Sequence, residues 1–551
     1  MSRARGSNLV AAGIFLSRIA GLIRNIVIGV VLGAQPAVTD AFTFAMRLPN
    51  LLQNLLGEGS LSASFIPVYA RLVEQKRHRE ADDLAGAVVA LLALVTSLIV
   101  VLAVLLARPM VWLFTSWEAD TEKYELTITL TRITTIGIGF LVISAWCLGI
   151  LNSHRNFFLS YVAPVIWNVT QIAALVGFSL LNWATDDIAV GVAWAVVAGG
   201  LLQLLVQLPK VRRLAPTVRV NLTPSEARAD VLRRFFPALG ARGVVQLSSY
   251  ADLVLASIFL VSGALAWYSF SLPLYLLPIS LFGFSVAAAE LAEMSRQSDN
   301  LEVVGGRLKP ALRRVLIPAG FITAAYLVAS PTFVDAIYGW PSRVLGQEGL
   351  QDPAKITTIA LVLTGFAVGL PATMTARVTQ NTLYSLGDVK GPARVAVVRL
   401  LVSTGAGLIL ILQFDWLTFS GEEIVEFGDF PHWPPWERVP AERRLSDDVP
   451  HLGAVGLSLG ASIAAWVEWV LLRRLLRRRL AGPVSSGWAL PVAIAAVIAS
   501  SIMAAASRFP VPSPLDAVAV GSAGLAAYAL ALWLQGVRPT LGSRQGLTSS
   551  T

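Results

Sequence analysis

The sequence predicts an all-α polytopic membrane protein with about 14 transmembrane helices, arranged as two pseudo-symmetric six-helix lobes followed by two C-terminal helices. Its 551 residues are 55% hydrophobic and only 14% charged, and the mean hydropathy is +0.67. These values exclude an ordinary soluble globular protein. Long apolar stretches recur from end to end, and each is able to cross a hydrocarbon core about 30 Å thick. The positions of the basic residues, described below, fit the same topology.

Apolar runs between polar breaks define fourteen candidate spans. They are residues 8–33, 38–70, 84–107, 126–151, 158–181, 188–208, 233–261, 265–292, 311–335, 356–383, 392–413, 452–472, 487–507 and 515–536. The second span is longer than a membrane requires and is interrupted at Pro49 and at 57–59, so we expect it to be bent. Arginines break the first apolar run and no small-residue cleavage site follows it, so we interpret this run as a retained helix and not as a signal peptide.

The basic residues of the loops follow the positive-inside rule. If the amino terminus is cytoplasmic, the inner loops hold 28 Lys and Arg residues and the outer loops hold 8, while the other 7 of the 43 lie inside spans. We therefore predict that both termini are cytoplasmic. Topological retention explains the basic runs at 210–220 and 471–480, with recruitment of anionic lipid or a partner as the alternative. It also removes the reason to expect nucleic acid as a partner.

A weak internal repeat divides the chain into four parts. We predict a first lobe at 1–208, a basic cytoplasmic linker at 209–232, a second lobe at 233–475 with an outer loop at 414–451, and two last helices with a cytoplasmic tail at 476–551. The outer loop is acidic, aromatic and Pro-rich, and is either a small cap or a plain connector. The second helix of each lobe carries a proline-broken segment. Such a pattern marks the central site of many transporters, although prolines also serve helix packing.

Three arginines lie inside the first two spans, at Arg18, Arg24 and Arg47. A charge at mid-bilayer costs roughly 2.5–3.5 kcal/mol, so the three together cost about 8–10 kcal/mol. That cost is tolerable if the side chains face a wet cavity and bind an anion there. A guanidinium stays charged at any relevant pH, and its planar fork of donors matches phosphate oxygens. The alternative for each arginine is that it lies near a membrane boundary and extends to water.

Helical geometry limits how these charges can act together. Asp40 and Arg47 lie within about 20° of one face and roughly 10 Å apart along a helix axis. Arg18 and Arg24 are about 9 Å and about 120° apart, so they line one wall only if the cavity is broad. A broad, net positive cavity suits a bulky anionic headgroup better than a small ion. Asp40 either neutralises Arg47 or Arg24 or acts as a gate, and the two roles are compatible.

Three further polar residues in spans are candidates. Glu58, between two glycines, either caps a helix break or contacts substrate. Asp252 in the seventh span either binds sodium or a proton or pairs with Arg242, and polar packing is an equal alternative. No role is assigned to Arg132, Arg377, Arg399 and Glu468, which we expect near span ends.

Several classes of function lack their residues in this sequence. No GxxxxGK[ST] motif is present, so ATP does not drive the chain directly, and no HExxH or GxSxG motif indicates an enzyme. The single cysteine, Cys147, excludes an intrachain disulfide and a thiolate metal cluster. The four histidines lie on separate loops, which does not suit a zinc site. We therefore predict no catalytic residues, no metal and no cofactor.

Several stretches of the chain resemble the MurJ/MviN family, bacterial lipid II flippases of the multidrug/oligosaccharidyl-lipid/polysaccharide exporter superfamily. The first 70 residues carry the most specific likeness, in SRIAGLIRN (17–25) and LGAQPAVTDAFTFAMRLPNLLQNLLGEGSLSASFIPVYA (32–70). Further likenesses are ILNSHRNF (150–157), APVIWNVTQI (163–172), AWAVVAGGLLQLLVQLPKV (193–211) and TLYSLGDVKGPARVAV (382–397). The resemblance covers residues 8 to about 475, and the family's fourteen helices agree with the number counted here.

The resemblance implies translocation of lipid II, an undecaprenyl-diphosphate-linked peptidoglycan precursor, for cell-wall biosynthesis. Movement would run from the cytoplasmic to the periplasmic leaflet of the bacterial cytoplasmic membrane by alternating access. The family's cavity arginines correspond to Arg18 and Arg24, a basic residue corresponds to Arg47, and the glutamate of its A-E-G-x-x-S motif corresponds to Glu58. We assign the arginines to the diphosphate and the sugar headgroup. Asp40, the cavity aspartate, is assigned to an ion-pair gate that opens when substrate displaces it.

The chain also departs from the family pattern. Gln53 and Asn54 stand where a basic pair is usual, and Leu272 and Pro273 stand where the eighth helix has Asp and Arg. Arg242 is a candidate to replace one of the missing charges. These departures keep open a flippase for another polyprenyl-diphosphate glycan, or a non-transporting scaffold for cell-wall enzymes. An exporter of small cationic amphiphiles is disfavoured because such a site needs acids.

The same resemblance implies an energy source for transport and a set of partners. We expect transport to be driven by the membrane potential or by a Na⁺ or H⁺ gradient, and potential supplies about 2.3 kcal/mol per charge per 100 mV. The expected partners are the polyprenyl-diphosphate lipid itself, membrane lipids, and proteins of cell-wall synthesis or division.

Overall fold

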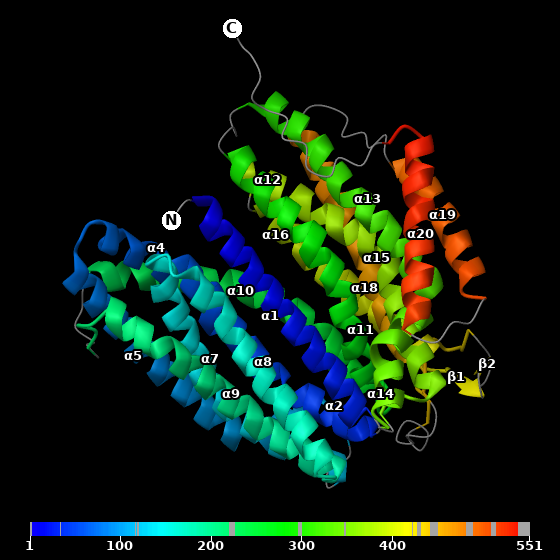
Figure 1. The fold of residues 1–551 in the computed structure, drawn as a ribbon, viewed down its shortest axis with the longest axis horizontal. Coiled ribbons are helices and arrows are strands. Elements are labelled where there is room, and N and C mark those ends of the chain that lie inside the picture. The colour runs from blue at the N-terminus through cyan, green and yellow to red at the C-terminus, as the bar shows by residue number, and fades with distance from the viewer. Residues whose placement is uncertain are drawn as a thin grey trace. The chain divides into compact units, whose positions relative to one another are not determined.

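The computed structural model is almost entirely helical (Figure 1). It describes residues 3–33, 35–115, 117, 121–219, 226–295, 300–346, 349–388, 390–420, 423–426, 431–440, 450–480, 489–508 and 514–537. Packing divides the chain into two compact units. Unit 1 comprises Met1–Ala266 with Gly346–Leu350 and Arg444–Asp447, and unit 2 comprises Trp267–Leu345, Gln351–Arg443 and Asp448–Thr551.

Unit 1 is a bundle of long helices interrupted in its second span. Its elements are α1 (Arg3–Leu32), α2 (Pro36–Ala45), α3 (Arg47–Leu52), a π-helical turn (Gln53–Glu58), α4 (Gly59–Glu74), α5 (His78–Leu105), α6 (Ala107–Phe114), α7 (Glu122–Ser153), α8 (Phe157–Leu180), α9 (Thr185–Leu214), α10 (Glu226–Phe259) and the first residues of α11 (Ala264–Pro278). Helix α1 packs along α8, and α7 packs between α5 and α9. The apolar core of this bundle includes Phe65 and Tyr69 of α4 and Trp146 of α7.

The predicted bend of the second span is confirmed, and its first break has a clear cause. Proline has no N–H and its ring displaces the carbonyl four residues earlier. Pro49 therefore cannot bond to the carbonyl of Ala45, where α2 ends. The hydroxyl of Thr134 on α7 lies 3.1 Å from that carbonyl and shares its proton with the carbonyl of Leu130, at 2.9 Å. A second break follows at the π-helical turn Gln53–Glu58, next to the two glycines.

Unit 2 is also helical, with one small hairpin. Its elements are the rest of α11, a π-helical turn (Ile279–Phe284), α12 (Ser285–Ser295), α13 (Leu301–Val334), a π-helical turn (Asp335–Gly339), α14 (Trp340–Val344), α15 (Pro353–Ser385), α16 (Lys390–Phe414), β1 (Leu417–Ser420), β2 (Glu423–Glu426), α18 (Gly453–Leu480), α19 (Ala489–Ala506) and α20 (Leu515–Leu534). The strands pair antiparallel, Leu417 opposite Glu426. They give the outer loop 414–451 local order.

Small residues let the central helices of unit 2 approach closely. A Cβ added to Gly460 of α18 would lie 2.6 Å from the backbone of Gly407 on α16, and one added to Gly369 of α15 would lie 2.6 Å from the hydroxyl oxygen of Ser462. In lipid, where apolar surface alone drives little association, such small-residue contacts are a main source of helix packing. Close backbone approach at these small residues therefore determines how α15, α16 and α18 pack together.

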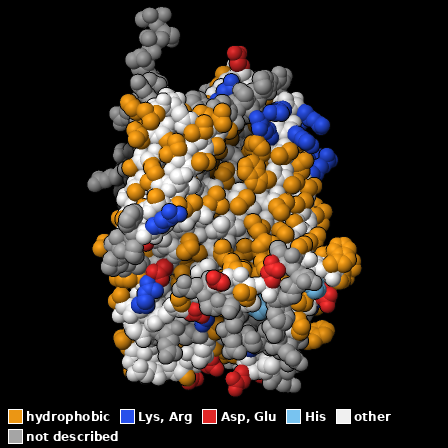
Figure 2. All heavy atoms as spheres, turned by 90° about the vertical axis from the view of Figure 1, so that its right-hand side faces the viewer, with side chains coloured by type: hydrophobic (Ala, Val, Ile, Leu, Met, Phe, Trp, Pro, Cys, Tyr) orange, Lys and Arg blue, Asp and Glu red, His pale blue; other side chains and the backbone are white. Residues whose placement is uncertain are grey.

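Eleven helices of the described residues are long and apolar enough to span a membrane. Each corresponds to one of the fourteen expected spans, and the total of fourteen stays a prediction. The three remaining spans, 8–33, 38–70 and 233–261, are those that hold the charged site candidates. Exposed apolar side chains cover α19 and α20, among them Val497, Val518 and Leu530. Figure 2 shows a broad apolar area on the face that these helices share, as a membrane protein requires.

The division into lobes at 209–232 stays a prediction, and the described packing adds one observation to it. Helix α10, which we expected to begin the second lobe, packs within unit 1. Its Asp230 pairs with Arg71 on α4 at 3.3 Å, and its Ser257 donates to the carbonyl of Phe114 at 2.7 Å. The described part of the linker is also held in place, because the backbone N–H of Thr217 donates to buried Asp82 at 2.9 Å.

Candidate functional site

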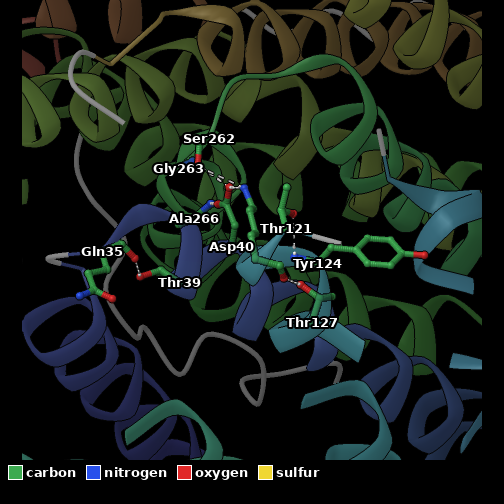
Figure 3. A network of polar contacts seen from close by, with 10 residues as sticks. Gln35, Thr39, Asp40, Thr121, Tyr124, Thr127, Ser262, Gly263 and Ala266 are labelled. Atoms are coloured by element: carbon green, nitrogen blue, oxygen red, sulfur yellow. Dashed lines mark hydrogen bonds and ion pairs between the residues drawn. The ribbon is translucent and has the colours of Figure 1, made fainter. Parts of the chain in front are cut away.

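Asp40 on α2 lies at the centre of a buried polar network in unit 1 (Figure 3). The residue is 1% exposed. Its Oδ2 accepts from the ammonium of Lys123 at 2.8 Å and from the backbone N–H of Gly263 at 2.7 Å. Its Oδ1 accepts from the backbone N–H of Ala266 at 2.8 Å. We call Asp40, Lys123, Ser262, Gly263 and Ala266 the Asp40 network.

The backbone donors of this network belong to the start of α11. The first N–H groups of a helix lack partners within the helix, and the helix dipole makes this end favourable for a negative charge. Asp40 therefore caps α11 from another helix. Gly263, the residue before α11, has a φ of +86°, a left-handed conformation that glycine adopts without the steric cost of a Cβ. This conformation aims its N–H at the carboxylate.

Lys123 is held from three sides. It is the second residue of α7, which Thr121 caps by accepting from the N–H of Tyr124 at 3.3 Å. Its Nζ reaches Asp40, lies 3.2 Å from the hydroxyl of Ser262, and lies 4.2 Å from the centre of the Trp117 ring. The side chain is only 14% exposed. The ammonium is thus neutralised, hydrogen-bonded and stacked on an aromatic face.

The partner of Asp40 differs from the one we expected. We considered Arg47 or Arg24, but the structure pairs Asp40 with Lys123, which the sequence places in an outer loop. The break after Ala45 separates Arg47 from the helix that carries Asp40. One signal could have identified Lys123, because a lysine in the first turn of a helix opposes the helix dipole and needs a compensating acid.

Arg24 on α1 faces α8. Its guanidinium carbon lies 5.0 Å from the centre of the Trp167 ring, and its Nη2 donates to Asn25 at 3.2 Å. Its Nε and Nη1 atoms are buried and have no acceptor among the described residues. The charge of Arg47 acts on Arg24, so these two cations lie within electrostatic range. A buried unpaired donor is costly, which indicates that a ligand or water supplies the acceptors.

Two further unsatisfied groups lie on α8 close to Trp167 in the sequence, and the sequence analysis did not select them. Asn168 and Gln171 are buried, three residues apart on one face. Their N–H₂ groups donate to carbonyls of α8, at Pro164 and Trp167, while Asn168 Oδ1 and Gln171 Oε1 have no donor among the described residues. We call Arg24, Trp167, Asn168 and Gln171 the Arg24 face. It combines free donors with free acceptors.

The other site candidates are placed as follows. Arg18 is exposed on α1. Arg47 begins α3 and is half-buried, and its carbonyl accepts from the hydroxyl of Tyr250 on α10. The side chains of Glu58, at the end of the π-helical turn, and of Arg242, on α10, lie outside the described residues, so their expected roles stay predictions. Asp252 is half-buried on α10 and has a partner.

Four charged residues that we expected near span ends lie inside long helices. Arg132, Arg377, Arg399 and Glu468 each stand more than two turns from the nearer end of their helices. Arg132 is exposed on α7. In unit 2, Arg399 of α16 pairs with Glu468 of α18 at 2.7 Å, and Glu468 is 4% exposed. Their distance from the membrane boundary stays a prediction, and the contact that the sequence did not show is the one between Arg399 and Glu468 across two helices.

Comparisons with known proteins agree with these features. Residues 28–420 match the family model described as lipid II flippase MurJ. The chain is 28% identical over 545 residues to the lipid II flippase MurJ of Burkholderia cenocepacia, covering 95% of both chains. It is 31% identical over 423 residues to a probable lipid II flippase MurJ of Bdellovibrio bacteriovorus, covering 75% of this chain and 78% of the relative.

Two solved structures have a similar fold. The fold matches a lipid II flippase MurJ in an inward closed conformation with a TM-score of 0.74, over 96% of this chain and all of that one, at 19% identity. It matches an inward-facing MATE family transporter with a TM-score of 0.64, over 84% of this chain and 94% of that one, at 17% identity. With the family model matched over more than half of its length, this multi-pass membrane protein belongs to the lipid II flippase MurJ family.

Proposed function

We propose that the chain moves lipid II from the cytoplasmic to the periplasmic leaflet by alternating access. The observation that carries the proposal is the pair of unsatisfied Arg24 donors, Nε and Nη1, buried in a membrane helix. A charged group in this position is expensive unless it serves a substrate. Membership of the MurJ family supplies the class of substrate, and the proposal assigns no catalytic residue.

The Arg24 face suits a diphosphate-linked sugar. The guanidinium donors match phosphate oxygens, and charge-assisted hydrogen bonds of this kind are stronger than neutral ones. Asn168 and Gln171 offer carbonyl oxygens, which accept from sugar hydroxyl or peptide N–H groups. Arg47, within electrostatic range of Arg24, adds positive charge beside it. The polyprenyl chain would stay in lipid, because it gains nothing from a polar site.

The Asp40 network supports a conformational role for Asp40. The carboxylate connects α2, the start of α7 and the start of α11 through charge-assisted contacts of 2.7–2.8 Å. Such contacts hold one conformation until another interaction offsets them. In our proposal they close one side of the transport pathway, and the Asp40–Lys123 pair separates when that side opens.

We also propose that fourteen helices span the membrane with both termini cytoplasmic, as the loop charges favour. In this orientation an inside-negative membrane potential drives an anionic diphosphate outward. The gain is about 2.3 kcal/mol per charge per 100 mV. A Na⁺ or H⁺ gradient is the alternative source of drive, and association with cell-wall synthesis or division proteins belongs to the same proposal.

Complementation tests the cargo. The chain is expressed in a bacterium depleted of its own lipid II flippase, beside Arg24→Ala and the matched control Arg132→Ala, whose arginine is exposed on α7. We expect survival with the wild type and the control, and loss of survival with Arg24→Ala. Rescue by all three proteins would instead show that transport does not need the buried guanidinium, whereas a non-transporting scaffold would rescue with none of them.

Another polyprenyl-diphosphate glycan is the second candidate cargo. The substitutions at Gln53–Asn54 and Leu272–Pro273 favour it, because they remove basic residues usual in the family. If the wild-type chain is present in the membrane but does not rescue the depleted bacterium, this candidate cargo would be favoured over lipid II. A scrambling assay with vesicles that hold a fluorescent polyprenyl-diphosphate sugar would then test it directly.

A further inference from the structure

Unit 2 holds a second polar cluster inside its membrane-spanning helices. It consists of Tyr275 on α11, Thr373, Arg377 and Gln380 on α15, Arg399 on α16 and Glu468 on α18, which we call the Arg377 cluster. Arg377 lies about 12 Å from the C-terminal end of α15, and Arg399 about 14 Å from the start of α16. Neither position is at a helix end.

Contacts within the cluster are specific. Arg399 Nη1 donates to Glu468 at 2.7 Å, and the side chain of Glu468 is 5% exposed. Arg377 Nη1 donates to Gln380 at 3.1 Å, and the hydroxyls of Tyr275 and Thr373 lie 3.0 Å apart. Glu468 and Arg399 both act electrostatically on Arg377. The six residues thus form one connected polar site.

The charges of the cluster do not balance. It holds two guanidinium groups and, among the described residues, a single carboxylate, Glu468. That carboxylate is already committed to Arg399. Arg377 therefore carries an excess positive charge in the interior of a membrane protein, and an uncompensated charge there is expensive. Packing alone does not explain an arginine at this position, because an apolar residue would avoid the cost.

Arg377 also has an unsatisfied hydrogen-bond donor. Its Nε is buried and has no acceptor in the described part of the chain. Its guanidinium lies 5.5 Å from the centre of the Phe284 ring, and Phe284 is 47% exposed. Arg399 keeps 28% of its side chain exposed. The site is consequently deep enough to select a charge and open enough for a small group to enter.

We infer that Arg377, Arg399 and Glu468 form an anion-binding site in unit 2 that takes a phosphate or diphosphate group. Two guanidinium groups present planar forks that fit several phosphate oxygens at once, whereas a chloride ion would use few of their donors. Glu468 positions Arg399 and limits the net charge to one, so an anion can leave again. The site rests on the charges of unit 2, and only its use for the lipid-linked diphosphate rests on the proposed function.

Binding to purified protein tests this inference. All proteins carry Arg24→Ala, which removes the candidate site of unit 1, and are placed in phosphatidylcholine nanodiscs. Calorimetry measures the affinity for inorganic pyrophosphate and for farnesyl diphosphate. Arg377→Gln should weaken binding of both probes at least about tenfold. Arg394→Gln is the matched control, since Arg394 is exposed on the same helix as Arg399, and it should change nothing.

A variant with the opposite sign makes the test sharper. Glu468→Gln removes the negative charge of the cluster, so it should tighten binding of both probes while Arg377→Gln weakens it. Thermal unfolding checks that each variant is folded. If Glu468→Gln displaces Arg399, Arg377→Lys is used instead. This variant keeps the charge but loses the planar fork of donors, so it should bind both probes more weakly than the Arg24→Ala parent.

The arms of the experiment separate the sources of the anion. Competition between pyrophosphate and farnesyl diphosphate supports a diphosphate site. Loss of binding of both probes when the protein is placed in phosphatidylglycerol nanodiscs supports the phosphate of a lipid headgroup. Equal affinities in Arg377→Gln and in its parent would overturn the inference. This result is independent of rescue by the wild-type chain, so failure of the site and failure of the proposed transport are distinguishable.

Discussion

Two polar regions of unit 1, on different helices, treat charge in opposite ways. In the Asp40 network both carboxylate oxygens and the Lys123 ammonium have partners within 3.2 Å. On the Arg24 face, two donors of Arg24 and the acceptors of Asn168 and Gln171 have none among the described residues. The first region is complete by itself and therefore sets a conformation. The second is complete only when a ligand or water supplies the missing partners.

The largest expected effect follows from leaving Asp40 buried without its cation. Lys123→Met should lower the free energy of unfolding by about 3 kcal/mol, the lower end of the range for breaking a buried pair, because two backbone N–H groups still hold the carboxylate. Thermal and denaturant unfolding in detergent measure the effect. Lys355→Met is the matched control, since Lys355 also lies in the first turn of a helix.

A double variant decides whether the loss belongs to the pair. Asp40→Asn combined with Lys123→Met removes both charges and should recover most of the stability that Lys123→Met loses. Additive losses in the double variant would show that the two side chains act independently, and the comparison between the two regions would then fail.

Arg24 should behave in the opposite way, with a large effect on ligand and a small one on folding. Arg24→Gln should weaken binding of a lipid-linked diphosphate by about tenfold or more, because it removes charge-assisted donors. The thermal unfolding midpoint should stay near that of the wild type, since the described contacts that Arg24 loses are those with the adjacent Asn25 and with the Trp167 ring. Calorimetry and thermal unfolding of one preparation measure both quantities. A stability loss as large as that of Lys123→Met would contradict the assignment.

Backbone geometry at Gly263 sharpens the account of the Asp40 network. Gly263→Ala forces a Cβ into a left-handed conformation, at a cost of about 1–2 kcal/mol, and turns the N–H away from the carboxylate. Unfolding measurements detect the cost. In the Asp40→Asn background the strain remains but the charge contact is absent, so the same substitution should cost less. An unchanged cost would assign the whole effect to strain.

The sequence predicted the long helices of this fold well, because apolar length and loop charge are local properties of a chain. It also predicted that the second span bends, since Pro49 lies inside it. What it missed depends on contacts between distant segments. Lys123 reaches Asp40 across 83 positions, and Trp167 lies against Arg24 through the packing of α1 on α8. Arg399 and Glu468 are 69 positions apart.

The bend itself offers a smaller test of how unit 1 positions Asp40. Thr134→Val removes the hydroxyl that donates to the carbonyl of Ala45, and hydrogen bonds inside membrane proteins average about 0.6 kcal/mol. We expect a loss of that size in unfolding experiments, with ligand binding at Arg24 unchanged. A loss several times larger would mean that this bond also holds α2 in the position from which Asp40 reaches α11.

The smallest expected effect concerns a third polar contact of unit 1, outside the spans. His154 follows α7, and its ring nitrogen lies 3.3 Å from the hydroxyl of Tyr69. Burial lowers the pKa of His154 below its usual value, and the charge of His78 adds to this, against an opposing effect of Asp82. The folded protein therefore binds this proton less readily than the unfolded chain does.

The sign of the pH dependence follows from that difference. The folded state is favoured most above the unfolded pKa of about 6.5, and stability falls as the pH drops below it. His154→Gln, which keeps a polar group beside Tyr69, should make the unfolding midpoint less sensitive between pH 7.5 and pH 5.5. His432→Gln is the control, because His432 lies in the outer loop of unit 2. An identical pH dependence in wild type and His154→Gln would place the titration at another residue.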